Sequence, residues 1–217
     1  MNTMGELRYQ LIFPTLFAIV DDFISDKESS LIFNYCKKQE SQPHNALEGD
    51  TTSSHSMKSV IFNELNRDIP SLNLLNKLQE VLDQYSHNFR MNKTYISNSW
   101  FNFQQPGSSL RLHMHQNSIV SGALFVNVDE YSSGIHFENP NPFSQFSNFM
   151  QNHSTERTFA SYKHIPVKNQ LVLFPSWLKH GSNYQKNQTK DRLVLSLNTA
   201  HKPDSLVPEV WTTYPPQ

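Results

Sequence analysis

The sequence has almost no cysteine: Cys36 is the only one among 217 residues. A single cysteine excludes a disulfide framework within the chain and any zinc site built from several thiolates. Because structural disulfides belong to oxidising compartments, this scarcity favours a reducing one. We expect the Cys36 thiol to be part of a hydrophobic core.

Neither sign of charge is in excess. Lys and Arg number 18 and Asp and Glu number 19, which gives a net charge of −1. Domains that hold nucleic acid through its phosphates are usually strongly basic, so this balance argues against a nucleic-acid partner. Charged residues make up only 17% of the chain and aromatic residues reach 12%, which excludes a disordered polar chain.

The sequence also lacks a long apolar run. The best stretch, Leu11 to Val20, is interrupted by Pro14 and is too short to span a bilayer. The segment before it carries Glu6 and has no apolar core of the kind that a secretory leader needs. These absences predict a cytoplasmic protein with no membrane partner. The length predicts one domain, 1–217, with an N-terminal part (1–90), a strand-rich core (91–200) and an extended, proline-containing tail (201–217).

Two helices are predicted in the N-terminal part. Ser25 and Glu28 form a capping box, and apolar residues follow at helical spacing, so we expect a helix from Asp26 to about Gln39. Residues 41–57 are polar and aperiodic, which predicts a loop. A second helix should begin after Pro70-Ser71. Its buried face is expected to consist of Leu74, Leu75, Leu78, Val81, Leu82, Tyr85 and Phe89.

After Arg90 the sequence becomes typical of β structure. Short segments of alternating polarity are separated by clusters of Pro, Gly, Asn and Ser. Helices followed by such segments predict an α+β fold whose strands form a β-sandwich or jelly roll. The expected strands are Leu11–Val20 (broken at Pro14), Tyr95–Phe103, Leu110–His115, Ser121–Val128, Ile135–Glu138, Leu171–Phe174 and Arg192–Thr199.

A long connection, residues 139–164, interrupts this strand-rich part and carries Phe143, Phe146 and Phe149. Loops of this length inside a domain usually have a function. We expect it to act as a lid, a substrate platform or the contact of a homodimer.

Histidine is abundant, with ten in the chain. His113 and His115 are two positions apart, and such residues of a strand point to one face, so both imidazoles can reach one ion. The intervening apolar residues Leu110, Leu112 and Met114 are expected to face the packed side. The alternative is a pair of surface histidines on an edge strand.

A third histidine, His180, follows the apolar strand that ends near Pro175. Further on, a strictly alternating strand places Leu193, Leu195 and Leu197 on one side and Arg192, Val194, Ser196 and Asn198 on the other. An arginine on the inner face of a barrel-like strand is costly without an anion, and its guanidinium suits a carboxylate. We infer three candidate metal ligands and one buried carboxylate clamp.

Together these motifs resemble the 2-oxoglutarate/Fe(II)-dependent oxygenase superfamily. More narrowly, they are similar to a subfamily known mostly from marine bacteria and phages. The resemblance covers about Tyr95 to Thr199, and Leu11 to Phe23 is similar to the start of that subfamily. The segments that carry it are Trp100-x-Asn102, Pro106-Gly107, His113-x-His115-x-x-Ser118, Ser121-Gly122, Leu173-Phe-Pro-Ser-Trp-Leu-x-His180 and Asp191-Arg192-x-x-x-Ser196-x-Asn198.

The resemblance implies a double-stranded β-helix, or jelly roll, buttressed by the two helices. It implies Fe(II) as cofactor, with His113 as the first ligand, His180 as the distal one and His115 at the position of the third. The implied reaction consumes 2-oxoglutarate and dioxygen. It hydroxylates a C–H bond of a peptide or a small molecule and releases succinate and CO2.

The resemblance also assigns residues to the cosubstrate. Arg192 matches the partner of the far carboxylate of 2-oxoglutarate, and Ser196 matches the hydroxyl that joins it. Asn102 and Gln104 match positions that lie against the cosubstrate, although Gln104 replaces a Tyr. Phe125 likewise stands where prolyl-hydroxylase-like members often carry Tyr.

Two departures bear on chemistry. The usual facial triad is two histidines and one carboxylate, and His115 stands at the carboxylate position. A neutral ligand leaves the iron more positive, although three-histidine iron sites do occur in thiol dioxygenases. Asn198 replaces a second Arg of the nucleic-acid demethylases, which argues against a nucleobase substrate.

Two other functions stay open. One is a non-catalytic jelly roll that binds a metal or a ligand, and the other is a three-histidine dioxygenase that does not use 2-oxoglutarate. His136, Trp100 and Trp177 are candidates for the pocket wall, with a surface or core histidine and plain core aromatics as the alternatives. We assign no role to His44, His55, His87, His153, His164 and His201.

Overall fold

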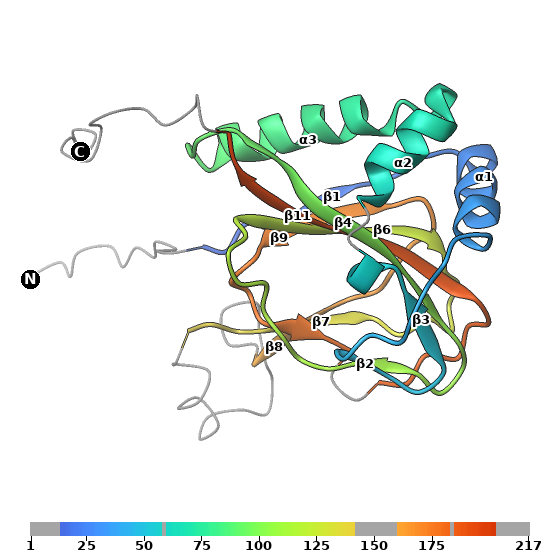
Figure 1. The fold of residues 1–217 in the computed structure, drawn as a ribbon. Helices are drawn as coiled ribbons and strands as arrows, with labels where there is room; N and C mark the ends of the chain where they lie inside the picture. The colour runs from blue at the N-terminus through green and yellow to red at the C-terminus, as the bar shows by residue number, and fades with distance from the viewer. Residues whose placement is uncertain (1–13, 58–59, 142–159, 183–184, 203–217) are drawn as a thin grey trace, which may run out of the picture.

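The computed structural model describes residues 14–57, 60–141, 160–182 and 185–202 (Figure 1). Three α-helices cover one face of a six-stranded antiparallel sheet, and a smaller sheet lies on the other side of it. Phe143, Phe146, Phe149, His153 and the tail beyond residue 202 lie outside the described residues. Within the described part, no helix is long and apolar enough to cross a membrane.

The first helix, α1 (Asp26–Cys36), begins at the predicted capping box. The Glu28 amide donates to Ser25 Oγ at 3.3 Å, and the Ser25 amide donates to the Glu28 carboxylate at 2.7 Å. The helix ends at Cys36 and not near Gln39, because the amides of Lys38 and Gln39 turn back to carbonyls three residues earlier. The Cys36 side chain is buried, as expected.

Helix α2 (Ile61–Asp68) was not expected from the sequence. It is short, and the side chain of its N-cap residue, Val60, makes no capping hydrogen bond. The cap comes from another element, since the Phe62 amide donates to Ser99 Oγ at 3.2 Å, and Ser99 lies on the strand β4 (Thr94–Gln104). Burial of Ile61, Phe62 and Leu65 then holds the helix on the sheet.

Helix α3 (Leu74–Asn88) follows a short 3₁₀ turn, η2 (Pro70–Leu72), and confirms the second predicted helix. Leu74, Leu78, Leu82 and Tyr85 are buried on it. Phe89 does not belong to this face: it follows the last helical residue and is 37% exposed.

The larger sheet has the strand order β1-β9-β6-β11-β4-β3, and the two long central strands β11 and β4 pair over most of their length (Figure 1). Four of the predicted strands in it are confirmed to within two residues at each end, whereas only Ala18–Val20 of the predicted strand Leu11–Val20 is a strand and residues 11–13 lie outside the described part. β3 was not predicted, and it lies in the segment 41–57 that was expected to be a loop. The remaining bounds are β1 (Ala18–Val20), β3 (Thr51–Ser53), β6 (Val120–Asn127), β9 (Leu171–Pro175) and β11 (Arg192–His201).

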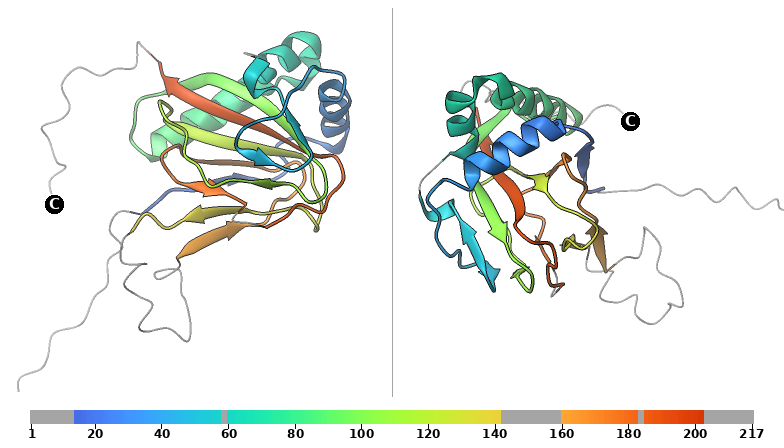
Figure 2. Two further views of the ribbon diagram at one scale, coloured as in Figure 1. Left: turned by 60° about the horizontal axis from the view of Figure 1, so that its bottom comes forward. Right: turned by 90° about the vertical axis from the view of Figure 1, so that its right-hand side faces the viewer.

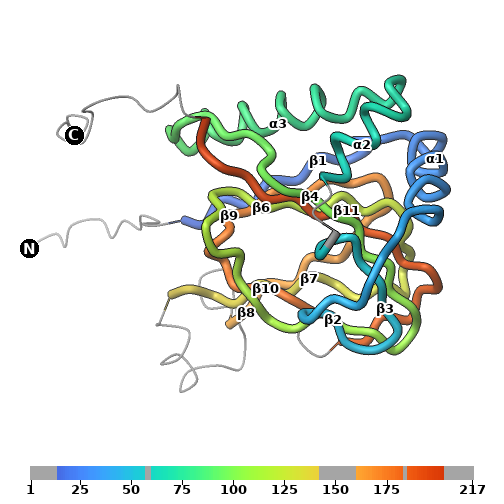
Figure 3. The backbone as a smooth tube through the Cα atoms, in the orientation of Figure 1, coloured from blue at the N-terminus to red at the C-terminus, as the bar shows by residue number. Residues whose placement is uncertain are grey.

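The smaller sheet has the order β10-β7-β8, formed by β7 (Ile135–Glu138), β8 (Ser161–His164) and β10 (His180–Gly181) (Figure 3). Beside it lies the ribbon of β2 (Leu47–Glu48) and β5 (Ser109–Leu110), and η1 (His55–Met57) follows β3. β8 occupies the end of the predicted 139–164 connection, and β2 and η1 lie in the segment 41–57.

Paired backbone hydrogen bonds of 2.9 Å between His113 and His180 join the β5 segment to β10. The chain after β5 therefore becomes part of the smaller layer. Figure 2 shows the two layers facing each other, which confirms the α+β double-stranded β-helix with supporting helices.

The alternation along β11 decides which side chains enter the space between the layers. Leu193, Leu195 and Leu197 pack in the core shared with the helices, as predicted. Val194 belongs to a second core between the sheets, and Arg192 and Ser196 line the same cavity as Val194. From Arg192 to Asn198, this strand therefore directs its polar side chains to the side that faces the smaller sheet.

Candidate metal centre

The three predicted ligands converge in the cavity between the sheets. His113 and His115 follow β5, and His180 begins β10. Their ligand atoms lie within 4.8 Å of one another, and Nε2 of His113 is 3.0 Å from Nε2 of His115. Two nitrogens bound at right angles about 2.1 Å from one ion would be about 3 Å apart, so the spacing of His113 and His115 fits a single metal ion.

Hydrogen bonds to the other ring nitrogens determine where the protons lie. Nδ1 of His113 donates to the Arg111 carbonyl at 2.8 Å, and Nδ1 of His180 donates to the Leu178 carbonyl at 2.8 Å. Nδ1 of His115 lies 2.5 Å from Asn198 Oδ1. A neutral imidazole has one proton, so each Nε2 carries a lone pair.

The lone pairs of His113 and His115 thus face each other at 3.0 Å, an arrangement that a cation stabilises. Holding a ligating histidine by its other nitrogen is also the usual support of protein metal sites.

Burial keeps these imidazoles neutral. It lowers the pKa of His180 to about 3 and that of His115 to about 4, and proximity to His113 adds to both effects. The pKa of His113 is lowered for the same reason, burial. A neutral imidazole is the form that binds a metal.

One expectation about this segment is wrong. The strand β5 ends at Leu110, so only the first residue of the predicted strand Leu110–His115 is in it, and His113 forms an isolated bridge. Met114 does not face the packed side, because its side chain is 53% exposed. The histidine side of the segment is the interior here, so the alternate position points to solvent.

Arg192 lies in the same cavity and is 6% exposed. Its guanidinium donates to Gln104 Oε1, opposite it on β4, and to the Ser133 carbonyl at 3.3 Å. Burial lowers the Arg192 pKa to about 10, so the group stays charged at neutral pH. Among the described residues, no carboxylate forms an ion pair with it. A buried cation without a counter-charge is costly, and an anionic ligand would remove that cost.

Unsatisfied donors support this interpretation. Arg192 Nε and Gln104 Nε2 are buried and have no hydrogen-bond partner among the residues that the structure describes, and a carboxylate could accept from both. Asn102 donates to Ser196 Oγ at 3.3 Å, and both line the cavity. The structure thus brings together all four residues predicted to bind the cosubstrate. Their roles, and those of the three histidines, stay predictions.

Of the other residues predicted for the pocket wall, one lines the cavity and two do not. Trp100 lines the cavity, with its ring 5.8 Å from that of His115. Trp177 is 53% exposed, so the interpretation of it as a core aromatic is wrong. His136 alternates with Ile135 and Phe137, which both pack in the inner core, so its ring points away from the metal centre.

Phe125 is fully buried in the core between the sheets. Its ring stacks on that of His164 at 5.9 Å. The cavity therefore receives no hydroxyl from this position, where prolyl-hydroxylase-like members often have Tyr.

Two histidines without a predicted role lie beside the site. His44 lines the cavity, and its ring is 4.3 Å from that of His55, which in turn is 4.8 Å from Trp100. Burial lowers the pKa of His44 to about 4 and also lowers that of His55. Both lie in the polar segment 41–57, where the histidines themselves were the only signal.

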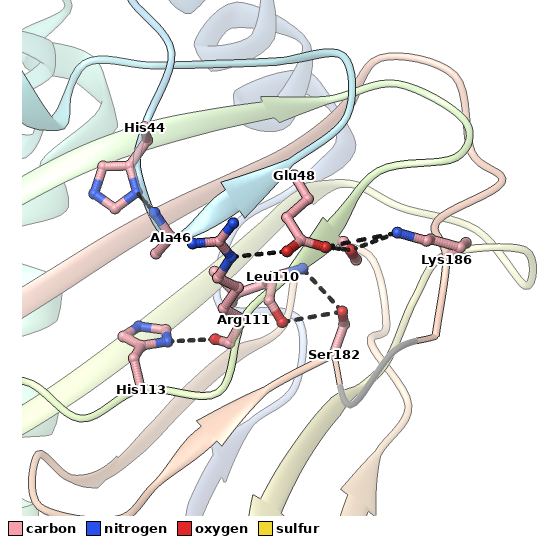
Figure 4. Close-up of polar contacts among 9 residues, drawn as sticks. His44, Ala46, Glu48, Leu110, Arg111, His113, Ser182 and Lys186 are labelled. Atoms are coloured by element: carbon pink, nitrogen blue, oxygen red, sulfur yellow. Dashed lines mark hydrogen bonds and ion pairs between the residues drawn. The ribbon is translucent and has the colours of Figure 1, made fainter.

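Backbone groups connect His44 to the first candidate ligand (Figure 4). The Ala46 amide donates to His44 Nδ1 at 3.1 Å, and the Arg111 amide donates to the Ala46 carbonyl at 2.8 Å. The Arg111 carbonyl then accepts from His113. Nearby, the Arg111 side chain bonds Glu48 at 2.7 Å, which ties β2 to the ligand-bearing segment.

Comparison with known proteins agrees with this geometry. Residues 98–198, just under half of the chain, match the model of the family described as "Putative 2OG-Fe(II) oxygenase". No curated protein matches the chain. The matched segment includes every residue placed above at the metal and cosubstrate sites.

Solved structures share the fold at low identity. A prolyl-4-hydroxylase from Pseudomonas putida is 13% identical, with a TM-score of 0.55, over 87% of this chain and 94% of its own. HygX from Streptomyces hygroscopicus, with nickel, 2-oxoglutarate and hygromycin B bound, is 11% identical, with a TM-score of 0.57, over 86% and 83%. A prolyl hydroxylase from Trichoplax adhaerens, in complex with a hypoxia inducible factor peptide fragment, is 14% identical, with a TM-score of 0.55, over 85% and 83%.

The family match and the shared fold indicate an enzyme of the 2-oxoglutarate/Fe(II) oxygenase type, which is an oxidoreductase. Fe(II) and 2-oxoglutarate are the cofactors of that type, and the three histidines and the buried donors fit them. The narrower resemblance to a subfamily from marine bacteria and phages stays a prediction.

Proposed function

We propose that this protein is a 2-oxoglutarate/Fe(II)-dependent dioxygenase that hydroxylates a C–H bond of a peptide or a small molecule. The observation that carries the proposal lies in one cavity. The Nε2 lone pairs of His113 and His115 face each other at 3.0 Å, and the Arg192 cation lies in the same cavity with no carboxylate partner in the described part of the chain. The first feature calls for a cation and the second for an anion. A divalent iron ion and a dicarboxylate meet both requirements.

Each group in the cavity has a distinct task. His113, His115 and His180 would hold Fe(II), and Arg192, Ser196 and Gln104 would bind the far carboxylate of 2-oxoglutarate. When bound, the iron supplies the oxygen chemistry that converts the cosubstrate to succinate and CO2 and hydroxylates the substrate. Apolar side chains in the cavity wall limit the access of water to these groups. They are Leu110, Ile135, Phe174 and Val194.

The wall beside the metal centre bears on the class of substrate. His44, His55 and Trp100 form a continuous aromatic contact, and burial favours the neutral form of both histidines. A neutral aromatic wall suits an uncharged peptide segment or small molecule better than a phosphate backbone. Among the solved structures that share the fold, the Trichoplax prolyl hydroxylase is described in complex with a peptide fragment, and HygX is described with the small molecule hygromycin B bound.

An anaerobic titration tests the proposal. Fe(II) and 2-oxoglutarate together should produce a visible metal-to-ligand charge-transfer band, because the keto acid chelates the iron. Succinate has no keto group and serves as the matched control that gives no band. Admission of oxygen should then release succinate from 2-oxoglutarate.

The outcomes separate the competing functions. Iron binding without the band would indicate a three-histidine dioxygenase that does not use 2-oxoglutarate. A band without succinate release, with or without added peptides, would indicate a binding protein with no oxygenase activity.

A further inference from the structure

Asn198, near the end of β11, contacts the candidate ligand that departs from the usual carboxylate. Its Oδ1 lies 2.5 Å from Nδ1 of His115 and accepts from Ser121 Oγ at 2.8 Å. Ser121 faces Asn198 across the β6–β11 pairing. Ser121 Oγ also lies 2.8 Å from Ser176 Oγ, in the turn that precedes His180.

The direction of each hydrogen bond follows from the chemistry of the groups. An amide oxygen only accepts, so His115 Nδ1 must carry the proton that it shares with Asn198. The Ser121 hydroxyl donates its single proton to the same oxygen. In its contact with Ser176, Ser121 must therefore accept, and the Ser176 hydroxyl donates. Asn198 Oδ1 thus receives two hydrogen bonds, which fill both of its lone pairs.

His115 differs from the other two histidines in the origin of its support. Nδ1 of His113 and of His180 is held by a main-chain carbonyl two residues earlier, which no substitution of a side chain removes. Nδ1 of His115 is held by side chains alone. A carboxylate in the place of His115 would have no proton to give, so an acceptor here is needed only because this residue is histidine.

We propose that Asn198 is the positioning residue that makes His115 a metal ligand, by accepting its Nδ1 proton and so directing its Nε2 lone pair at the ion. The inference rests on the three-histidine site of the proposed function and deepens it. Removal of a group that supports a ligating histidine typically weakens metal binding by about 10- to 100-fold.

Cobalt substitution provides a readout independent of turnover. In a Co(II) protein, each bound imidazole with a protonated Nδ1 gives one strongly shifted proton NMR signal that disappears in D2O. We expect three such signals in the unaltered protein. In Asn198→Leu, one of them should broaden or vanish through exchange with water, and Co(II) affinity should fall about 10- to 100-fold.

Two variants serve as controls. Asn198→Asp keeps an acceptor and should restore the third signal and the affinity. Thr199→Val removes hydrogen bonds to the Val120 backbone from the next residue of the same strand, on its other side. It should lower stability but keep all three signals.

Three signals and unchanged affinity in Asn198→Leu would overturn the inference and leave the proposed function intact. Two signals in the unaltered protein that persist in Asn198→Leu, with unchanged Co(II) affinity, would remove His115 from the metal site and overturn both the inference and the three-histidine site on which it rests. If circular dichroism shows that Asn198→Leu does not fold, the NMR signals and the Co(II) affinity of Asn198→Ala are measured instead. The same outcomes support or overturn the inference.

Discussion

Some histidines of this barrel point into the cavity and are candidate metal ligands, whereas His136 on a neighbouring strand does not point into it. His113, His115 and His180 each donate a hydrogen bond from Nδ1, and the unprotonated Nε2 of each faces the other two. His136 lies on the neighbouring strand β7, but its ring points to the other face, away from the cavity. Residue type alone therefore does not make a ligand here. The direction of the side chain and the position of its proton do.

His113→Ala or His180→Ala should abolish tight Fe(II) binding while the fold persists, because two remaining imidazoles rarely hold a divalent ion against water. Anaerobic equilibrium dialysis with Fe(II) measures the loss, and circular dichroism checks the fold. His136→Ala is the matched control and should bind one equivalent of iron. Stoichiometric iron in either ligand variant would remove that residue from the site.

Arg192→Ala should raise the concentration of 2-oxoglutarate needed for half-saturation. Losing one partner of a desolvated, hydrogen-bonded charge pair costs about 2–5 kcal/mol, or roughly 30- to 5,000-fold in affinity. Titration of the charge-transfer band gives the constant. Arg67→Ala removes an exposed arginine of α2, paired with Asp68, and should leave it unchanged. Equal affinity in the two variants would place the cosubstrate elsewhere.

At the scale of elements, the metal centre depends on how closely two segments approach. β10 carries His180 and Gly181, and it packs against the chain that carries Arg111 and His113. A Cβ atom at Gly181 would lie 2.7 Å from the Arg111 carbonyl oxygen, which is the acceptor for His113 Nδ1. A glycine is needed here because a main chain, and not a flexible side chain, occupies the space.

Gly181→Ala should therefore damage stability and metal binding together. Overpacking typically costs about 1–3 kcal/mol, and the displaced carbonyl would release the His113 ring. Gly134→Ala is a matched control, because its Cβ would lie 2.8 Å from the His164 carbonyl, which supports no ligand. Urea unfolding should show a loss in both variants, whereas Co(II) affinity should fall only in Gly181→Ala. Unchanged affinity in Gly181→Ala would show that the Arg111 carbonyl does not orient His113.

At the scale of the whole molecule, the buried imidazoles couple stability to pH. The folded-state pKa is about 4 for His44 and His115 and about 3 for His180, against roughly 6.5 for histidine in an unfolded chain. Below about pH 6.5 these histidines therefore bind protons in the unfolded chain but stay neutral in the folded, metal-free protein. Stability from these groups is complete above that pH and is lost progressively as the pH falls from there toward their folded-state pKa values of about 3 to 4.

The metal-free protein should accordingly unfold at a lower urea concentration at pH 5.5 than at pH 7.5. Each such group contributes up to about 1.4 kcal/mol per pH unit below its unfolded pKa. The His180→Ala variant lacks one of them, so its stability should depend less steeply on pH. Equal midpoints for the unaltered protein at both pH values would contradict neutral, buried imidazoles.

Local signals in the sequence were sufficient for many elements. The capping box at Ser25 marked the start of α1, and strict alternation marked β11 and the direction of its side chains. α2 and β10 needed partners distant in the sequence. α2 takes its cap from Ser99 on β4, and β10 is a strand of two residues that exists because β7 and His113 pair with it.

The sequence by itself also determined which residues could hold an ion and an anion: His113, His115, His180 and Arg192 followed from spacing, alternation and a family resemblance. Alternation states that two residues share a face, but not which face is the interior, and only the folded barrel placed Met114 in solvent. It likewise brought Asn198 to His115, 83 positions earlier, and His44 to the cavity wall. Such contacts arise from strand pairing across the chain, which no local pattern of residues encodes.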